Sequence, residues 1–326
     1  PVTLDEWMIP VVKNIDLDRV KFPLIMVQEY GLNIFRLAAS VTLALESMSN
    51  AHVLLKTLVT DIKREENSYI LKYKEDASEE EAKFDYLINA ARFKSGEIDD
   101  MLGFKRDRFV EFKAAYVTKW ESDEVWPELI FFGERGTPRG MAQFTPYPDG
   151  YVQLHGMTED ITLFKDGLVK SELLSAQPKL DEKYVNKIYR GWSRSDVERR
   201  SSLAIDHLAQ FITSFRDATV ASKPLFGAQQ IPGEDATLRA ADVSFESDRY
   251  ARCEIVKASS VLGMADAITK KLIGLGFVDS ALYGSRGHTK IKPFREENIS
   301  KLAQDLCIQR DYPKSLARRE NNSLMI

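Results

Sequence analysis

The chain has 326 residues, 44% of them hydrophobic and 29% charged, which is enough apolar material for one large or two ordinary domains with their own cores. Its formal net charge of −4 and its pI near 5.8 argue against a nucleic-acid binder, because neutralising a phosphate backbone takes an excess of Lys and Arg. We therefore expect a small-molecule substrate or another protein as the partner.

The start of the chain and its cysteines bear on the compartment. The N-terminal stretch Pro1 to Trp7 lacks a basic n-region and an apolar h-region, and no run of about 18 apolar residues follows, so we expect neither a secretion signal nor a membrane span. Cys253 and Cys307 lie far apart without metal-ligand spacing, which favours a reducing, cytoplasmic compartment. The chain lacks an initiator Met and begins in mid-pattern, from which we expect a fragment or a processed product.

The first third of the chain predicts a helix followed by strands. Residues 33–48 repeat apolar side chains at helical spacing. Residues 52–63 and 69–73 have the pattern of two paired strands, and the acidic run 75–81 is expected to be a solvated loop. Residues 84–91 form a short apolar run that ends in small residues, which is typical of a buried parallel strand leading into a tight turn.

The middle of the chain changes character. Residues 108–132 are rich in strand-forming residues, and residues 133–154 place Gly and Pro at turn positions, which indicates an antiparallel meander. Residues 195–221 return to helical periodicity, and Ser195 and Glu198 have the spacing of a capping box at the start of a helix.

The last part of the chain predicts a second strand and helix unit. Residues 250–256 have a strand pattern, Ala258–Ser260 a turn pattern, and residues 264–273 a helical pattern. A further helix is predicted over residues 296–306, before a polar tail.

Three segments could carry chemistry. The small residues Asn89 to Ala91 would let the backbone approach a cofactor, although an ordinary buried strand with a turn is the commoner meaning of this pattern. Residues 139–156 read as a hairpin around a Pro-Asp-Gly turn. Residues 223–233 form a loop rich in Gly and Pro, and in residues 254–262 a helix N-terminus would offer N–H groups to an electron-rich ligand.

The joint order of these segments resembles FAD-dependent oxidoreductases of the D-amino-acid oxidase family. Residues 57–62, read as T-x-V-x-x-I after a helix, are similar to the segment that precedes the family's AAG turn, and residues 89–91 stand where that turn belongs. Residues 140–156 resemble the family's substrate-domain hairpin, and residues 224–227 the loop before its C-terminal flavin-binding unit. The resemblance covers most of residues 24–275.

The resemblance implies an α/β (α+β) fold in which a partial Rossmann-like FAD-binding domain is interrupted by a mostly antiparallel substrate-binding sheet. The predicted division is a partial FAD-binding domain (1–105), a substrate domain (106–220), a C-terminal FAD-binding portion (221–290), and a C-terminal helix and tail (291–326).

The resemblance also implies a cofactor, a reaction and site residues. The cofactor is FAD, and the reaction is hydride transfer to the flavin from a small amine, an amino acid or a hydroxy acid. Val59 would face the adenine. The remaining cofactor residues implied are Ala90, Ala91, Arg92, Gly227, Lys257, Ala258, Ser259, Ser260 and Leu262. Gln143, Tyr147 and Arg239 are the predicted substrate-binding residues.

Two departures from the family leave an alternative open. Arg92 replaces a family Gly and could either crowd the cofactor or pair with its phosphates. No G-x-G-x-x-G fingerprint is present, because Gly274-Leu275-Gly276 ends a predicted helix and is followed by Asp279. The alternative is a non-catalytic fragment or subunit that binds a partner chain, or a second copy, through the surface left open by the missing unit.

The histidines do not suggest a metal site. His52, His155, His207 and His288 are too scattered in the sequence to form a ligand set, and each is expected to be a surface or packing residue.

Overall fold

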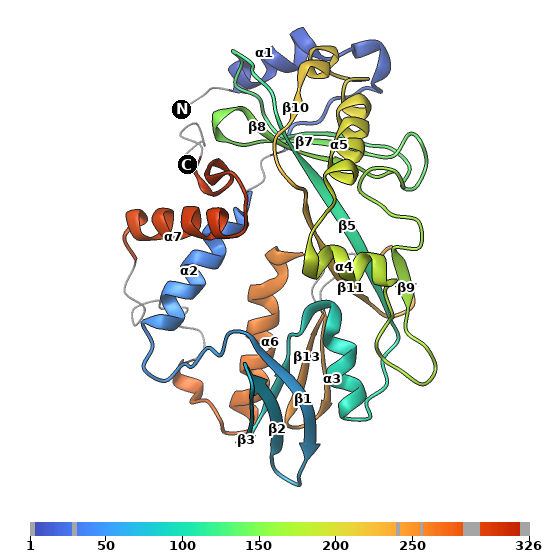
Figure 1. Cartoon of the computed structure of the whole chain (residues 1–326). Helices are drawn as coiled ribbons and strands as arrows, with labels where there is room; N and C mark the ends of the chain where they lie inside the picture. Colours follow the sequence, from blue (N-terminus) through green and yellow to red (C-terminus); the bar gives the residue numbers. More distant parts are fainter. Residues whose placement is uncertain (1–3, 28–30, 239–241, 255–256, 283–293, 320–326) are drawn as a thin grey trace.

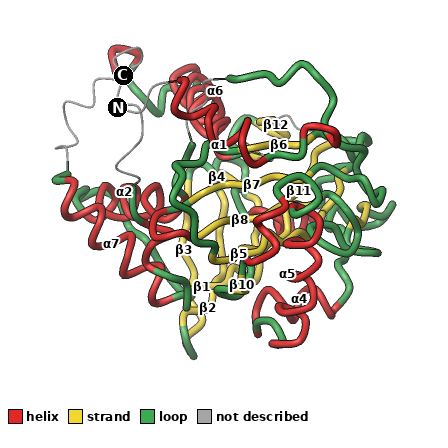
Figure 2. The backbone as a smooth tube through the Cα atoms, turned by 90° about the horizontal axis from the view of Figure 1, so that it is seen from above, coloured by secondary structure: helices red, strands yellow, loops and turns green. Residues whose placement is uncertain are grey.

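The computed structural model of the chain describes residues 4–27, 31–238, 242–254, 257–282 and 294–319. Three sheets lie along the molecule, and the long strand β5 runs from the small mixed sheet at one end toward α1 at the other (Figure 1). Figure 2 shows α2 and α7 on one side of the strands and α4 and α5 on another. This mixed α/β fold agrees with the predicted fold class.

The largest sheet is antiparallel and built around β5 (Arg108–Lys119). Its strand order is β10-β5-β8-β7-β6, and β9 and β11 also pair with β5. The predicted meander is present as β7 and β8, which are joined by the tight turn at Pro148–Gly150. The partner strands are β6 (Leu129–Phe131), β7 (Ala142–Pro146), β8 (Tyr151–Gly156), β9 (Leu168–Lys170), β10 (Thr219–Val220) and β11 (Leu225–Pro232).

One face of this sheet is apolar and packs against α4 (Glu182–Arg190) and α5 (Arg194–Leu208). Alternate residues of β5 point to this face, where Tyr116 joins the main core cluster and Phe112 stacks on Tyr184 of α4 with ring centroids 5.0 Å apart. The helix α1 (Leu4–Asn14) contributes Val11 to the same cluster.

The start of α5 differs from the capping-box prediction. Ser193 is the N-cap, because its Oγ accepts a hydrogen bond of 3.2 Å from the Asp196 backbone N–H. Ser195 lies inside the helix, and Glu198 pairs with Arg194. The helix therefore begins two residues earlier than the prediction.

The end of the opposite face is covered by α2 (Ile34–Glu46) and α7 (Glu296–Gln309). Both helices were predicted from periodicity, and they pack Phe35, Ala39 and Cys307 against Val117 of β5. Cys253 and Cys307 are free thiols.

A separate antiparallel sheet contains β1 (Thr57–Arg64), β2 (Tyr69–Glu75) and β3 (Ser78–Phe84). The acidic run was predicted to be a loop, but most of it forms β3, with the turn at Asp76. The prediction was wrong because the run of carboxylates hid the strand, whose Glu side chains remain exposed while only Ala82 is half-buried.

The third sheet contains the predicted parallel strand. Its order is β12 (Asp242–Ser247), β13 (Tyr250–Glu254) and β4 (Leu87–Asn89). β4 is parallel to β13 and leads into α3 (Ser95–Met101), while β13 precedes α6 (Val261–Gly274). Ile88 remains 45% exposed, so β4 is less buried than the sequence indicates.

Short 3₁₀ segments complete the described structure: η1 (Leu17–Arg19), η2 (Arg92–Lys94), η3 (Pro148–Gly150), η4 (Thr213–Asp217), η5 (Ala258–Ser260), η6 (Ser280–Leu282) and η8 (Lys314–Ala317). In the ranges the structure describes, no helix has the length and apolarity needed to cross a bilayer.

Candidate functional site

Two predicted cofactor segments leave the same edge of the mixed sheet. Asn89 of β4 lies beside Arg252 of β13, and the strands are parallel, so their carboxyl ends coincide. Ala90, Ala91 and η2 follow one strand, and η5 and α6 follow the other. The crevice outside the carboxyl ends of parallel strands is the usual ligand position in α/β sheets.

The turn after β4 has an unusual backbone. Arg92 adopts φ 57°, in the left-handed region that favours glycine, which is the residue that the family resemblance leads us to expect there. Holding a non-glycine residue there costs on the order of 1 kcal/mol. The Arg92 side chain is exposed, and within the described residues its guanidinium makes no ion pair or hydrogen bond. It does not crowd the turn.

The segment after β13 presents backbone to the same edge. Lys257, Ala258, Ser259 and Leu262 are exposed, and Ser260 caps α6 without a side-chain hydrogen bond. The first N–H groups of this 14-residue helix therefore carry their partial positive charge at the edge where Arg92 lies.

Val59 lies near this sheet. It occupies a position in β1 where the pairing with β2 shifts register, and it packs on the apolar cluster that includes Leu87 and Tyr250. Such bulges re-aim the backbone locally.

A second group of polar residues lies on the large sheet, on the face opposite α5. Since side chains alternate along a strand, the residues between the apolar positions point to this face. We call it the polar face; it carries Glu111 and Lys113 of β5, Gln143 and Thr145 of β7, Gln153 and His155 of β8, and Gly227 and Gln229 of β11.

Glu111 is the centre of the charge on the polar face. Its side chain is buried, and its carboxylate contacts Lys113 Nζ at 2.8 Å, accepts from Gln229 Nε2 at 3.2 Å, and forms an ion pair with Arg135. Two cations therefore face one carboxylate. Arg135 Nη1 is buried and has no hydrogen-bond partner among the described residues.

Sequence reasoning missed Glu111, Lys113 and Arg135. A signal existed, because Glu111 and Lys113 alternate with Val110, Phe112 and Ala114 in an otherwise apolar strand. Charges at alternate positions of such a strand indicate a polar, half-buried face.

His155 is half-buried on the polar face. Burial, aided by the positive charge of Lys113, lowers its pKa from 6.5 to about 4, so the ring is neutral at neutral pH. Its Nε2 lies 2.9 Å from Gln153 Nε2, which can only donate; the histidine nitrogen therefore accepts, and the proton is on Nδ1.

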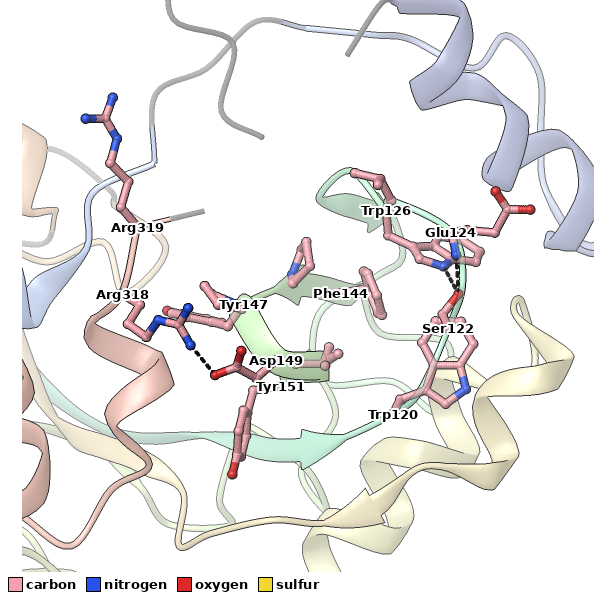
Figure 3. Close-up of a pocket in the computed structure, with 15 residues that line it drawn as sticks. Trp120, Ser122, Glu124, Trp126, Phe144, Tyr147, Asp149, Tyr151, Arg318 and Arg319 are labelled. Carbon is pink, nitrogen blue, oxygen red and sulfur yellow. Dashed lines mark hydrogen bonds and ion pairs between the residues drawn. The ribbon is translucent and has the colours of Figure 1, made fainter. Parts of the chain in front are cut away.

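Tyr147 joins the polar face to a neighbouring pocket. Its hydroxyl donates to Gln153 Oε1 at 3.3 Å, and burial raises its pKa to about 12. The pocket, of about 240 Å³, is lined by aromatic rings including Trp120 and Trp126, and Arg318 pairs with Asp149 at 2.5 Å beside it (Figure 3). Tyr147 thus contributes to both surfaces.

The other predicted substrate residues are separated. Gln143 lies on the polar face, where its amide donates to Glu128 and, at 3.3 Å, to Thr145 Oγ1. Arg239 lies outside the described residues.

Strand β11 connects the large sheet with the mixed sheet. It pairs with β5 along its length and also lies against η2 and β13. Gln230 of β11 donates to the Cys253 carbonyl at 2.9 Å. Gly227, predicted as a cofactor residue, therefore lies in the large sheet, in a segment that was predicted to be a loop and forms β11 instead. The predicted C-terminal FAD-binding portion thus contributes β11 to the large sheet and β12 and β13 to the mixed sheet.

Gly227 also marks open space on the polar face. A Cβ placed on Gly227 would have no atom of another described residue within 4 Å, apart from its two chain neighbours. Its pairing partner on β5 is Lys113, so this opening adjoins the charged group around Glu111. In the ranges described, no group of three or more His, Cys, Asp or Glu side chains is arranged to hold a metal ion.

Comparison with known proteins gives only distant structural similarities. No family model matches the sequence, and no curated protein matches it. Similar solved structures include L-proline dehydrogenase from P. horikoshii (15% identity, TM-score 0.41, 71% of this chain and 52% of that one) and glycerol-3-phosphate dehydrogenase from Bacillus halodurans complexed with FAD (11%, 0.47, 74% and 42%). Glycine oxidase from Geobacillus kaustophilus is similar at 8% identity with a TM-score of 0.40, over 73% of this chain and 52% of that one.

This chain thus spans about half the length of these structures. Since no TM-score among them reaches 0.5, the assignment of a function depends on the residues of this chain.

Proposed function

We propose that this chain is part of an FAD-dependent oxidoreductase of the D-amino-acid oxidase group, which oxidises a small amine, an amino acid or a hydroxy acid by hydride transfer. The observation that carries the proposal is strand β11, which pairs with β5 of the antiparallel sheet and lies against η2 and β13 on the side of the parallel pair. A cofactor at the edge and a substrate on the face would lie side by side.

The residues at the edge fit FAD. Ala90 and Ala91 leave the backbone accessible, and the Arg92 guanidinium, which has no partner among the described residues, suits a diphosphate. Lys257 to Leu262 would lie at the isoalloxazine end, Val59 near the adenine, and the open space at Gly227 leaves room between edge and face. When bound, FAD supplies a two-electron acceptor.

The polar face fits the substrate. Lys113 and Arg135 are cations of the polar face, and among the three substrate classes we propose the amino acids and hydroxy acids, whose carboxylate these cations would bind. Gln143 and Tyr147 are the proposed neutral groups beside these cations, and His155 adds a neutral hydrogen-bonding group. Arg239, outside the described residues, stays a proposed substrate residue on the sequence alone.

The test uses the full-length natural protein. We expect flavin absorbance near ~450 nm after purification or after addition of FAD. The flavin-containing protein is then mixed anaerobically with panels of amines, α-amino acids and α-hydroxy acids. At least one of the acids should reduce the flavin and so abolish this band. A protein that stays colourless and binds no added FAD would overturn the proposal.

A second candidate is a non-catalytic subunit that binds a partner chain or a second copy. Among the described strands, β4 is an edge strand with Ile88 exposed, and large apolar side chains are also exposed elsewhere in the described chain, such as Ile25 at 78% and Leu55 at 75%. Native mass spectrometry decides between the candidates: a stable complex with a second chain and no flavin supports the subunit.

The free thiols fit the proposed cytoplasmic location.

A further inference from the structure

A buried cluster of charges lies between the two halves of the candidate site. Asp99 of α3, Arg108 of β5, and Arg252 and Glu254 of β13 are each fully buried. Asp99 accepts from Arg252 Nε at 2.8 and 2.9 Å and pairs with Arg108, whose Nη2 also lies 3.5 Å from Glu254. The two cations and two carboxylates balance.

Part of the cluster lacks hydrogen bonds, although Arg252 Nη1 also donates to Ser244 Oγ at 2.7 Å and to Glu246 Oε1 at 2.9 Å. Arg108 Nε and Nη1, Arg252 Nη2 and Glu254 Oε1 are buried without a hydrogen-bond partner in the part of the chain that is described. Buried ion pairs generally contribute little net stability compared with apolar packing, so their value lies more often in fixing one arrangement.

A chain of hydrogen bonds leads from this cluster to the turn after β4. The Tyr250 hydroxyl donates to Asp99 Oδ1 at 2.6 Å and accepts from Asn89 Nδ2 at 2.8 Å. Asn89 Nδ2 also donates to the Ser95 carbonyl, and its Oδ1 accepts from the Ala91 N–H at 3.2 Å. Both ends of the η2 turn are thus tied to one amide side chain.

The same cluster holds the large sheet. Arg108 is the first residue of β5, and Arg106, just before it, donates to Glu254 at 2.7 Å. The edge that carries Ala90 to Arg92 and the strand that carries Glu111 and Lys113 are therefore fixed to the same four charges.

We propose that Tyr250 is a positioning residue: its hydroxyl, anchored on Asp99, holds Asn89 and so fixes the turn Ala90 to Arg92 in place against the polar face. The inference rests on the proposed function for what the turn binds. Tyr250 is the first residue of β13 and is fully buried, so it would not contact the cofactor itself. Its effect reaches the site through the Asn89 amide.

The chain offers a matched control. Tyr116 is also fully buried, and its hydroxyl also makes two hydrogen bonds, to the Ile161 carbonyl at 2.8 Å and from Arg200 Nε at 3.1 Å. It belongs to the core under α5. Tyr250→Phe and Tyr116→Phe therefore each remove a buried hydroxyl that makes two hydrogen bonds. Only the Tyr250 hydroxyl is connected by hydrogen bonds to the turn after β4.

The first measurement needs no cofactor. Amide hydrogen exchange on the full chain should show faster exchange at Ala91 to Phe93 in Tyr250→Phe, and unchanged exchange there in Tyr116→Phe. Equal exchange at the turn in the wild type and Tyr250→Phe would overturn the positioning role, whatever the chain binds.

The second measurement is FAD affinity from flavin fluorescence and the visible spectrum. Since a buried hydrogen bond contributes about 1 kcal/mol, Tyr250→Phe should weaken FAD about fivefold to tenfold and shift the flavin band, whereas Tyr116→Phe should match the wild type. An equal loss of FAD affinity in both variants would show that Tyr250 only stabilises the fold. A wild type that binds no FAD would instead refute the proposed function and leave the exchange result standing.

Discussion

Gly227 of β11 pairs with Lys113 of β5, and beyond its chain neighbours no described residue comes within 4 Å of the position that a Cβ on the glycine would take. The pair lies on the polar face, in the strand that also contacts η2 and β13. This relationship makes the size of residue 227 and the charge of residue 113 the most direct probes of the site.

Filling the space at Gly227 should block binding and spare the fold. Gly227→Ala should behave like the wild type, because its Cβ meets nothing, whereas Gly227→Leu extends into the opening and should weaken FAD or substrate binding by about tenfold or more. Thermal unfolding should change little in both. Full binding by Gly227→Leu would show that the opening is not used.

Removing the Lys113 charge should weaken acidic substrates selectively. A charge-assisted hydrogen bond is worth about 1.5–3 kcal/mol, so Lys113→Met should raise KM for amino or hydroxy acids about tenfold to a hundredfold. Lys119→Met is the control, since Lys119 is on the same strand but exposed at its end. A similar change in KM for both variants would show that Lys113 does not belong to the substrate site.

His155 should make stability depend on pH. Its pKa is lowered from 6.5 to about 4 in the folded protein, so between these values the unfolded chain binds a proton that the native state does not. The free energy of unfolding should therefore fall as the pH drops from 6.5 toward 4. Urea unfolding of the wild type and His155→Gln at pH 7 and 5 measures this, and an NMR titration of His155 near pH 6.5 would contradict it.

Substitutions at Arg92 distinguish the effect of backbone strain from that of phosphate binding. Arg92→Gly removes a left-handed non-glycine residue and should change the free energy of unfolding by no more than about 1 kcal/mol, yet weaken FAD if the guanidinium pairs with its diphosphate. Arg92→Lys keeps the charge and should retain part of the affinity. FAD titrations at low and high salt are the measurement; tighter binding by the glycine variant would mean that Arg92 obstructs the cofactor.

The N-cap of α5 gives a test of the fold alone. Ser193→Ala should cost about 1 kcal/mol in the free energy of unfolding, because the Asp196 N–H loses its acceptor. Ser195→Ala, at the position that the sequence pattern favoured, should change it by less than about 0.5 kcal/mol. Chemical denaturation of both variants compares them, and the reverse order would place the cap at Ser195.

Local patterns in the sequence were enough to predict several elements. Apolar spacing predicted α2, α6 and α7, and the short apolar run before Asn89 predicted a parallel strand and turn, because helix and strand periodicities are set within a few residues. Gln143, predicted to bind substrate, and Gly227, predicted to bind the cofactor, come from separate segments of the sequence, and no local pattern indicated that both lie on one face of one sheet.

Only the tertiary structure decided which residues meet. Glu111 and Arg135 are 24 residues apart and Asn89 and Tyr250 are 161 apart, so no local pattern reports their contact. The carboxylates of β3 concealed a strand whose pairing with β2 overrides its low propensity. The charges around Asp99 were equally hidden, because burial and pairing are properties of the packed chain and not of any segment of it.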